Sequence, residues 1–243
     1  MIYNYNTRPY VVINGRNSKT IKGLIISELP PITKPAQRAE IEQIDGRDGD
    51  IITPLGFNAY DKVIKIGLSF GYDIDDIITY FSGEGKIVFS NEPDKYYYFT
   101  ALEQVDFERL LRFKTAEISL HVQPFKFSDN EGKVALFPSS NGGEVEIRNN
   151  GNYFARPYLL LNGRGVSTLS INSSEILEID FGDFTEILID PRTMNAYNKD
   201  KTILLNRRVN GDYDKIRLTP GKNILTFSGN VVQIELWEFS RWL

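Results

Sequence analysis

The sequence contains no cysteine and only one histidine, His121. The absence of cysteine excludes disulfide bonds, thiolate metal sites and cysteine nucleophiles. A histidine-dependent catalytic dyad or triad would have to use His121, which lies in an alternating stretch and faces the opposite way from Leu120 and Val122. We interpret His121 as a structural residue. Neither a cluster of metal ligands nor a Gly-x-x-x-x-Gly-Lys phosphate loop occurs in the sequence, so we expect no metal and no cofactor.

The sequence also lacks any apolar run that approaches the roughly 18 residues of a membrane span. Residues 1–6 have neither the basic nor the apolar region of a signal peptide. We therefore expect a protein that is made and folded in a cytoplasm and does not insert into a membrane. The formal net charge of −4 argues against a broad nucleic-acid-binding surface, because such a surface needs clustered Lys and Arg.

A chain of 243 residues is long enough for two modest domains, and it can bury roughly 70–75% of its unfolded surface. The alternation of apolar and polar residues breaks at 123–130, and a polar, glycine-rich stretch follows at 139–143. We predict a domain boundary here, with one domain over residues 1–128 and a second over residues 129–243.

The first half reads as a sheet with one helix. The Asn14-Gly15 pair predicts a hairpin between residues 10–13 and 24–26, because both central residues of a type I′ turn need positive φ. Asp73 is expected to cap a helix over 74–81, where apolar residues recur at i, i+3, i+4 and i+7. Further strands are predicted at 62–70, 86–89, 96–101, 110–113 and 115–122.

The tyrosine run at 96–98 resembles a stacking platform for bases or sugars. Because successive strand residues face opposite sides, Tyr97 and Phe99 share one face, and Tyr96 and Tyr98 share the other. We predict that both faces are covered by packing.

The second half is a succession of short strands with no helix. The predicted strands are 145–147, 158–161, 169–171, 176–180, 186–190, 201–205, 224–227 and 231–236. Turn signals separate them at Asn150-Gly151, Asn162-Gly163, Asp190-Pro191, Asn210-Gly211 and Ser228-Gly229-Asn230. This regular spacing predicts a β-sandwich of jelly-roll type.

Two alternative functions of the second half stay open at this point. Carboxylates that could converge as a glycosidase pair are Asp180, Asp183, Glu186 and Asp190. Acidic residues near turns are usually solvated, so we do not expect an enzyme. A sandwich of this type can also bind sugar through exposed aromatic rings. Trp237 lies inside an alternating strand and is expected to pack, which leaves Trp242 as the candidate glycan-binding residue in a carbohydrate-binding module.

The most distinctive segment is a charged loop that follows a proline-punctuated stretch at 29–35. Its residues are Asp45, Gly46, Arg47, Asp48, Gly49 and Asp50. The two glycines permit tight turns, and the planar guanidinium of Arg47 suits a carboxylate on a neighbouring molecule. The spacing does not fit a calcium loop of the EF type. The loop is either a solvated surface turn or a contact with another subunit.

Several segments occur in the order found in a known family. They are Gly23-Leu24-Ile25-Ile26, Pro30-Pro31-Ile32, residues 41–50 and 122–127, Asn149-Asn150-Gly151-Asn152, Ala155-Arg156-Pro157, residues 218–223 and Ser240-Arg241-Trp242. This ordered set resembles the distal tail proteins of bacteriophages and prophages of Gram-positive hosts that have long, non-contractile tails. Asp45 stands where a proline is common in that family.

The resemblance implies a mainly β structural protein of the virion tail tip. Relatives form a hexameric ring from N-terminal α+β domains, each a β-sandwich or split barrel with one helix. Galectin-like jelly-roll sandwiches at the C-terminus surround that ring. It joins the tail tube and tape-measure proteins to the baseplate or tail fibre for host adsorption, and DNA passes through its lumen. Some relatives grasp receptor-binding proteins with an insertion in the C-terminal sandwich; we expect this chain to be too short for that insertion and do not expect direct contacts with receptor-binding proteins. We expect the segment from 29 to 50 to bind a neighbouring subunit, with Arg47 paired to an acidic group there.

Overall fold

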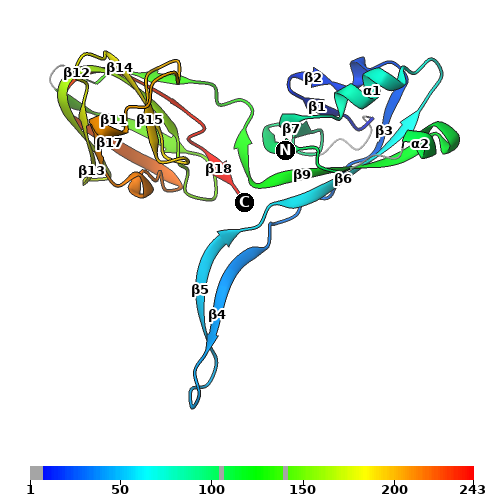
Figure 1. The fold of residues 1–243 in the computed structure, drawn as a ribbon, viewed down its shortest axis with the longest axis horizontal. Helices are drawn as coiled ribbons and strands as arrows, with labels where there is room; N and C mark the ends of the chain where they lie inside the picture. The colour runs from blue at the N-terminus through cyan, green and yellow to red at the C-terminus, as the bar shows by residue number, and fades with distance from the viewer. Residues whose placement is uncertain (1–7, 104–106, 139–141) are drawn as a thin grey trace. The chain divides into compact units, whose positions relative to one another are not determined.

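The protein is mainly β, as predicted. The structure, a computed structural model, describes residues 8–103, 107–138 and 142–243. It consists of two compact units, one that runs to Asp129 and includes Leu243, and one from Asn130 to Trp242 (Figure 1). Each unit has its own hydrophobic core. No helix in these described ranges is long and apolar enough to cross a membrane.

The first unit is built on an antiparallel sheet with the strand order β2-β1-β7-β8-β9-β6-β3. Its strands are β1 Val11–Ile13, β2 Arg16–Asn17, β3 Leu24–Glu28, β6 Tyr60–Leu68, β7 Glu84–Phe89, β8 Lys95–Thr100 and β9 Thr115–Ser128. β9 begins where predicted but continues past residue 122 to Ser128. The break in alternation at 123–128 therefore lies within a strand and does not end it.

The predicted turn at Asn14-Gly15 forms, with φ angles of 48° and 83°. It joins β1 to the short strand β2, so the predicted pairing of residues 10–13 with 24–26 is wrong. The chain leaves β2 through the 3-10 helix η1, Ser18–Thr20, where the buried Ser18 hydroxyl accepts a hydrogen bond from the Val11 backbone N–H. Residues 24–28 then form β3, which pairs with β6 at the edge of the sheet.

The helices α1 and α2 accompany this sheet. α1, Ile74–Tyr80, begins at Asp73 as predicted, and the Asp73 carboxylate accepts hydrogen bonds from the first-turn backbone N–H groups. α2, Phe107–Phe113, was not expected, and the predicted strand at 110–113 is wrong. Phe107, Leu110 and Leu111 have helical spacing, and Leu110 is completely buried in the core.

Both faces of β8 are covered, which confirms the expectation for the tyrosine run. Tyr97 and Phe99 lie in the main core of the first unit and are 1% and 2% exposed. Tyr96 packs on the opposite face against Val88 and Phe127.

The second unit contains β10 Val134–Leu136, β11 Gly142–Asn149, β12 Tyr158–Ile171, β13 Ser174–Asp180, β14 Glu186–Asp190, β15 Asn195–Tyr197, β16 Val209–Gly211, β17 Gly221–Trp237 and β18 Arg241–Trp242. The short 3-10 helices η2, Asn206–Arg208, and η3, Tyr213–Lys215, lie between β15 and β17. β10 to β17 form one eight-stranded sheet, in which β12 and β17 pair with each other; β18 is not part of this sheet.

Four of the strands predicted as separate are segments of two long strands in the structure. Residues 158–161 and 169–171 belong to β12, and residues 224–227 and 231–236 belong to β17. The turns predicted at Asn162-Gly163 and at 228–230 are irregularities where the β12–β17 register shifts. A β-bulge uses the same small, flexible residues as a turn, so the sequence signal does not distinguish them.

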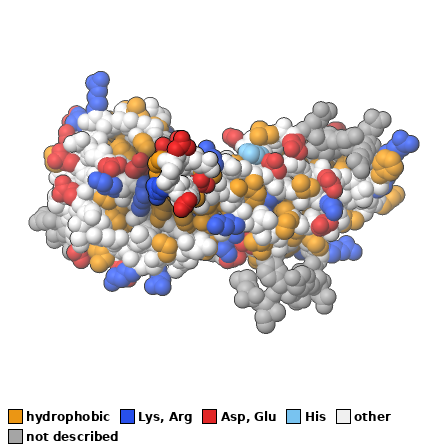
Figure 2. Space-filling model, turned by 90° about the horizontal axis from the view of Figure 1, so that it is seen from below, with side chains coloured by type: hydrophobic (Ala, Val, Ile, Leu, Met, Phe, Trp, Pro, Cys, Tyr) orange, Lys and Arg blue, Asp and Glu red, His pale blue; other side chains and the backbone are white. Residues whose placement is uncertain are grey.

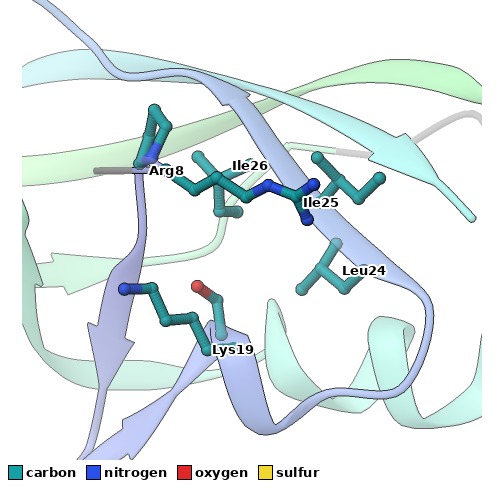
Figure 3. Close-up of a pocket in the computed structure, with 7 residues that line it drawn as sticks. Arg8, Lys19, Leu24, Ile25 and Ile26 are labelled. Atoms are coloured by element: carbon teal, nitrogen blue, oxygen red, sulfur yellow. The ribbon is translucent and has the colours of Figure 1, made fainter. Parts of the chain in front are cut away.

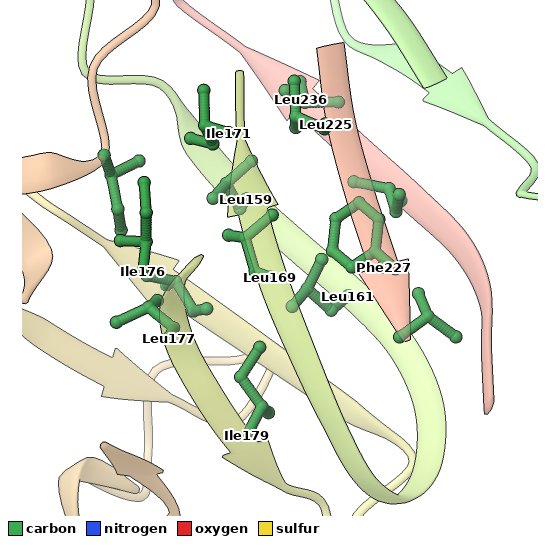
Figure 4. Packing of buried hydrophobic residues seen from close by; sticks show 14 of the residues in the cluster. Leu159, Leu161, Leu169, Ile171, Ile176, Leu177, Ile179, Leu225, Phe227 and Leu236 are labelled. Atoms are coloured by element: carbon green, nitrogen blue, oxygen red, sulfur yellow. The ribbon is translucent and has the colours of Figure 1, made fainter. Parts of the chain in front are cut away.

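Each long strand places its inward side chains in the core of the second unit. Leu159 and Leu161 come from the first half of β12, Leu169 from its second half, and Leu225 and Phe227 from β17 (Figure 4). All five are at most 2% exposed. The continuous strands thus bend around one apolar interior.

The predicted strand at 201–205 is also wrong, apart from a single bridge between Tyr197 and Leu204. The Asn198 side chain accepts a hydrogen bond from the Ile203 backbone N–H and donates one to the Thr202 hydroxyl. Local side-chain hydrogen bonds of this kind compete with strand pairing. Leu204 is consequently 59% exposed.

Candidate subunit interface: the β4–β5 hairpin

β4, Gln37–Gln43, and β5, Asp50–Phe57, form a two-stranded sheet of their own, separate from the larger sheet of the first unit (Figure 1). They pair in antiparallel register from Gln37 opposite Phe57 to Gln43 opposite Asp50. Sequence reasoning anticipated an extended approach and a charged loop here, but not these two strands. Two-stranded hairpins alone are marginally stable in water.

One face of the hairpin is apolar and exposed. Ile41 lies opposite Ile52, and Ala39 lies opposite Pro54, so these four residues share a face. Ile41 and Ile52 are 61% and 62% exposed. The other face carries the polar residues Arg38, Glu40, Glu42 and Thr53, together with Ile51 opposite Glu42. A ribbon with one exposed apolar face is suited to binding another surface.

The tip of the hairpin holds all six residues predicted from sequence as an interface. Residues 45–49 form the turn, and Asp50 is the first residue of β5. The Arg47 backbone N–H donates a hydrogen bond of 3.1 Å to the Ile44 carbonyl oxygen. Gly46 and Gly49 both have φ of +79°, which favours glycine at each position. All six residues are exposed, so the tip presents its charges to solvent.

The proline segment before β4 is anchored to the first unit by hydrogen bonds to its backbone carbonyl groups. Lys62 Nζ donates to Pro31 O at 2.8 Å, and Asn91 Nδ2 donates to Pro30 O at 3.0 Å. The base of the hairpin closes through Asn58 N–H to Ala36 O at 2.9 Å. The Phe57 ring packs edge-on against Phe125 of β9, with centroids 5.6 Å apart. The hairpin therefore starts from a fixed base.

A buried polar cluster supports this anchor. Lys126 Nζ lies 2.9 Å from Glu92 Oε1, and the Tyr97 hydroxyl donates to Glu92 Oε2 at 2.9 Å. The Lys62 ammonium lies over the rings of Tyr97 and Tyr60, 5.0 and 5.5 Å from their centroids. Lys62 is 3% exposed and Lys126 is 6% exposed. Buried charges of this kind need partners to offset lost hydration.

The cluster shifts the protonation of its members. Burial lowers the pKa of Lys62 to about 8, an effect that Glu92 opposes and Lys126 reinforces. Burial raises the pKa of Tyr97, and the negative charge of Glu92 raises it further. Burial also raises the pKa of Tyr60. No sequence signal marked Lys62, Glu92 or Lys126, because they come from separate segments and meet only in the fold.

Other sequence-predicted residues lie elsewhere. His121 sits on the outer face of β9, with Nδ1 2.7 Å from Asp61 Oδ1 on the neighbouring strand. Trp237 packs as predicted, stacked on Tyr158 with centroids 5.1 Å apart. Trp242 is half-buried in β18. A hollow of about 360 Å³ in the second unit is lined by polar residues such as Asn172 and Asp212, and not by Trp242.

Three of the four carboxylates considered as a glycosidase pair have partners of their own. Asp180 pairs with Arg208 at 2.8 Å, and Glu186 pairs with Lys199 at 2.8 Å. Asp190 is buried and accepts a hydrogen bond from the Arg192 backbone N–H. Across 8–103, 107–138 and 142–243, no three His, Asp or Glu side chains are grouped so as to hold a metal ion.

A second hollow, of about 280 Å³, lies beside the edge strand β3. Its lining combines Leu24, Ile25 and Ile26 with the basic side chains of Arg8 and Lys19 (Figure 3). The surface beside β3 is therefore basic and apolar at the same time.

No protein-family model and no curated protein matches the sequence. Solved structures do match the structure of this chain. The crystal structure of the Dit protein of phage SPP1, described as a paradigm of the hub adsorption apparatus in phages that infect Gram-positive bacteria, superposes with a TM-score of 0.67. The match covers 98% of this chain and 100% of that chain at 14% identity.

The chain has the Dit fold. A chain of the phage P2 baseplate, solved in its activated conformation with Ca, gives a TM-score of 0.53 at 11% identity and covers 98% of each chain. Both matches extend over both units of the present structure. These matches confirm the fold that the ordered sequence segments implied. The matched region includes the first unit, from which the β4–β5 hairpin extends.

Proposed function

We propose that the protein is a structural component of a phage tail tip that acts by self-assembly and not by catalysis. Copies of the chain form a closed hexameric ring at the distal end of the tail. The ring connects the tail tube and tape-measure proteins to the baseplate or tail fibre, and DNA passes through its lumen without specific binding. The protein is assembled in the host cytoplasm and resides in the virion.

The observation that carries this proposal is the exposed apolar face of the β4–β5 hairpin. Ile41 and Ile52 are nearly two-thirds exposed at the centre of a two-stranded ribbon. Burial of apolar surface contributes about 25 cal/mol per Å², and a partner surface supplies the missing cover. The Dit fold and the anchored base of the hairpin support the same conclusion.

The arrangement also suits a ring rather than an isolated dimer. A closed ring uses a heterologous interface, in which one patch on each copy meets a different patch on the next copy. The hairpin is such a patch, because it is a projecting element with a rigid base. Anchoring Pro30 and Pro31 before binding reduces the conformational entropy lost when the hairpin docks.

The test is the mass of the purified protein over a range of concentrations, measured by light scattering and combined with negative-stain imaging. We expect closed rings for the wild type. The double variant Ile41→Thr/Ile52→Thr keeps β-branched residues in the hairpin but removes its apolar face, so it should shift the population towards monomer.

The matched control is Ile203→Thr, which changes an isoleucine that is 46% exposed in the second unit. This control should assemble like the wild type. Wild-type protein that stays monomeric at every concentration, or a hairpin variant that forms rings as well as the wild type does, would contradict the proposal.

A further inference from the structure

A second exposed apolar surface lies on the first unit, at the end of the sheet where β6 and β9 meet α2. Its apolar residues are Ile25, Phe70, Leu111 and Phe113. Phe70 is fully exposed, and Phe113 is 61% exposed. Leu111 and Ile25 are 39% and 38% exposed. We call this surface, together with the exposed cations Lys22, Arg112 and Lys114, the basic-apolar patch.

Backbone contacts bring the parts of the basic-apolar patch together. Ile25 of β3 is paired with Gly67 of β6, and Gly67 is paired with Thr115 of β9, so these three positions lie in one row across the sheet. Leu68 N–H donates to Lys114 O at 2.9 Å, and Ser69 N–H donates to Gly23 O at 2.8 Å. These bonds hold the Phe70 loop beside the ends of β3 and α2.

Two cations of the patch lie against aromatic rings. Lys114 Nζ donates to the Tyr72 hydroxyl at 3.0 Å and lies 4.7 Å from the centre of that ring. The Arg112 guanidinium lies 5.4 Å from the centre of the Phe113 ring. Figure 2 shows hydrophobic and basic side chains next to one another at the α2 end of the first unit. The hollow beside β3 adds Arg8 and Lys19 to this basic surface.

The β4–β5 hairpin is complementary in composition to the basic-apolar patch, because it is acidic and apolar. Its apolar face contains Ile41 and Ile52, and residues 37–57 carry five acidic and two basic side chains: Glu40, Glu42, Asp45, Asp48 and Asp50 against Arg38 and Arg47. An acidic-apolar ribbon and a basic-apolar surface therefore occur on the same chain. Complementary charge guides association and selects against a wrong partner.

The two surfaces lie at opposite ends of the same strand. β6 begins at Tyr60, just after the base of the hairpin, and ends at Leu68, beside the patch. Nine residues of strand separate the two ends by roughly 25–30 Å. This placement gives each copy one acidic-apolar end and one basic-apolar end, which is the condition for head-to-tail association.

We propose that the basic-apolar patch is the surface on which the β4–β5 hairpin of a second copy of this chain docks. The proposal rests on the ring assembly proposed above and names the acceptor surface for it. Ile41 and Ile52 of one copy cover Phe70 and Phe113 of the next, and the acidic residues of the hairpin lie near Arg112 and Lys114.

The absence of natural cysteine allows a direct test by disulfide trapping. The double variant Ile52→Cys/Phe113→Cys is oxidised mildly and analysed on a non-reducing gel. We expect a ladder of covalent multimers, because each copy donates one cysteine to each of two neighbours. An equal mixture of the two single variants should instead stop at dimers. The matched control Ile52→Cys/Ile203→Cys should give no ladder.

A second measurement uses charge. Arg112→Glu/Lys114→Glu should weaken assembly at least tenfold in light scattering, and adding Asp48→Lys/Asp50→Lys should restore part of that loss. Both substitutions lie on exposed side chains, so circular dichroism should show an unchanged fold.

The outcomes separate this inference from the proposed function. Protein that assembles but gives no ladder, and whose assembly is insensitive to Arg112→Glu/Lys114→Glu, would overturn the patch and leave self-assembly standing. Wild-type protein that remains monomeric, with no ladder from the double variant, would overturn both.

Discussion

Lys62 Nζ donates a hydrogen bond of 2.8 Å to the backbone carbonyl oxygen of Pro31. This bond joins a buried ammonium group on β6 to the proline segment that leads into the hairpin. The same ammonium lies beside the Glu92–Lys126 pair and over the Tyr97 ring. The position of the proposed interface element therefore depends on a charged cluster inside the first unit.

The lowered pKa of Lys62 predicts that stability depends on pH. Its pKa is about 8 in the folded protein and 10.5 ordinarily. Between these values the unfolded chain binds more protons than the folded chain does, so the free energy of unfolding should rise with pH from about 8 to about 10. Above about pH 10 the tyrosines with raised pKa values, Tyr60 and Tyr97, should reverse the trend, because the unfolded chain then loses protons that the folded chain keeps.

Denaturant unfolding of the wild type and of Lys62→Met at several pH values checks this dependence. The variant should lose the rise between pH about 8 and about 10. A wild-type stability that is flat or falling over that window would contradict the assignment, as would a rise that persists in Lys62→Met.

Removal of one member of the buried pair should be costly. Glu92→Gln leaves Lys126 with only part of its compensation, and we expect a loss of about 3 kcal/mol in the free energy of unfolding. The double variant Glu92→Gln/Lys126→Met should lose less than the sum of the single losses. The control is Glu146→Gln, which removes a surface pair with Lys222 that is more than half exposed and should cost at most about 1 kcal/mol. Equal losses at Glu92 and Glu146 would show that the buried pair is not specially important.

Two glycines with positive φ should differ in their tolerance of alanine. At Gly211, with φ of +132°, an added Cβ would lie 2.1 Å from the Ile176 carbonyl oxygen. At Gly83, with φ of +81°, an added Cβ would meet nothing within 4 Å. We expect Gly211→Ala to destabilise the protein by about 3 kcal/mol or more and Gly83→Ala by about 1 kcal/mol. Thermal unfolding of both variants measures the difference, and similar costs would contradict a steric cause at Gly211.

Arg47 at the hairpin tip should matter for assembly and not for folding, through a pair with an acidic group of the neighbouring copy that lies outside the basic-apolar patch. Its side chain is exposed, so Arg47→Ala should unfold at the wild-type temperature but form fewer multimers in light scattering. Arg47→Lys, which keeps the charge but not the planar donor group, should show an intermediate loss. Arg207→Ala changes another exposed arginine and serves as the control. Full assembly of Arg47→Ala would remove Arg47 from the interface.

Local sequence signals predicted those parts of the fold that depend on neighbouring residues. Asp73 caps α1 because its carboxylate reaches backbone groups two and three residues ahead. The Asn14-Gly15 turn follows from backbone angles that those two residues adopt easily. The strand that follows the turn was predicted wrongly. β1 pairs with β2, because η1 separates β2 from residues 24–26, which form β3 and pair with β6.

The candidate interface was predicted at its tip but not in its architecture. The glycines and charges at 45–50 were visible in the sequence, whereas β4 and β5 were not predicted as strands. Residues 38–42 alternate between polar and apolar side chains, but this short pattern lies between a proline-punctuated stretch and a charged loop, and both faces of the ribbon are largely exposed. The cluster was unpredictable for a different reason. Lys62 and Lys126 lie on β6 and β9, whereas Glu92 lies in the turn between β7 and β8, and only the fold brings these segments together.

β17 has a consequence for the order in which the protein is made. This strand, Gly221–Trp237, pairs with β10, β11 and β12, so it completes a sheet whose other members are synthesised earlier. During translation the earlier strands wait with open edges until residues 221–237 leave the ribosome. Such edges can pair with other chains, and nascent copies close together are exposed to that hazard. Rapid synthesis of β17 therefore shortens the time for which these edges are open. A premature stop codon within β17 would leave the sheet of the second unit incomplete.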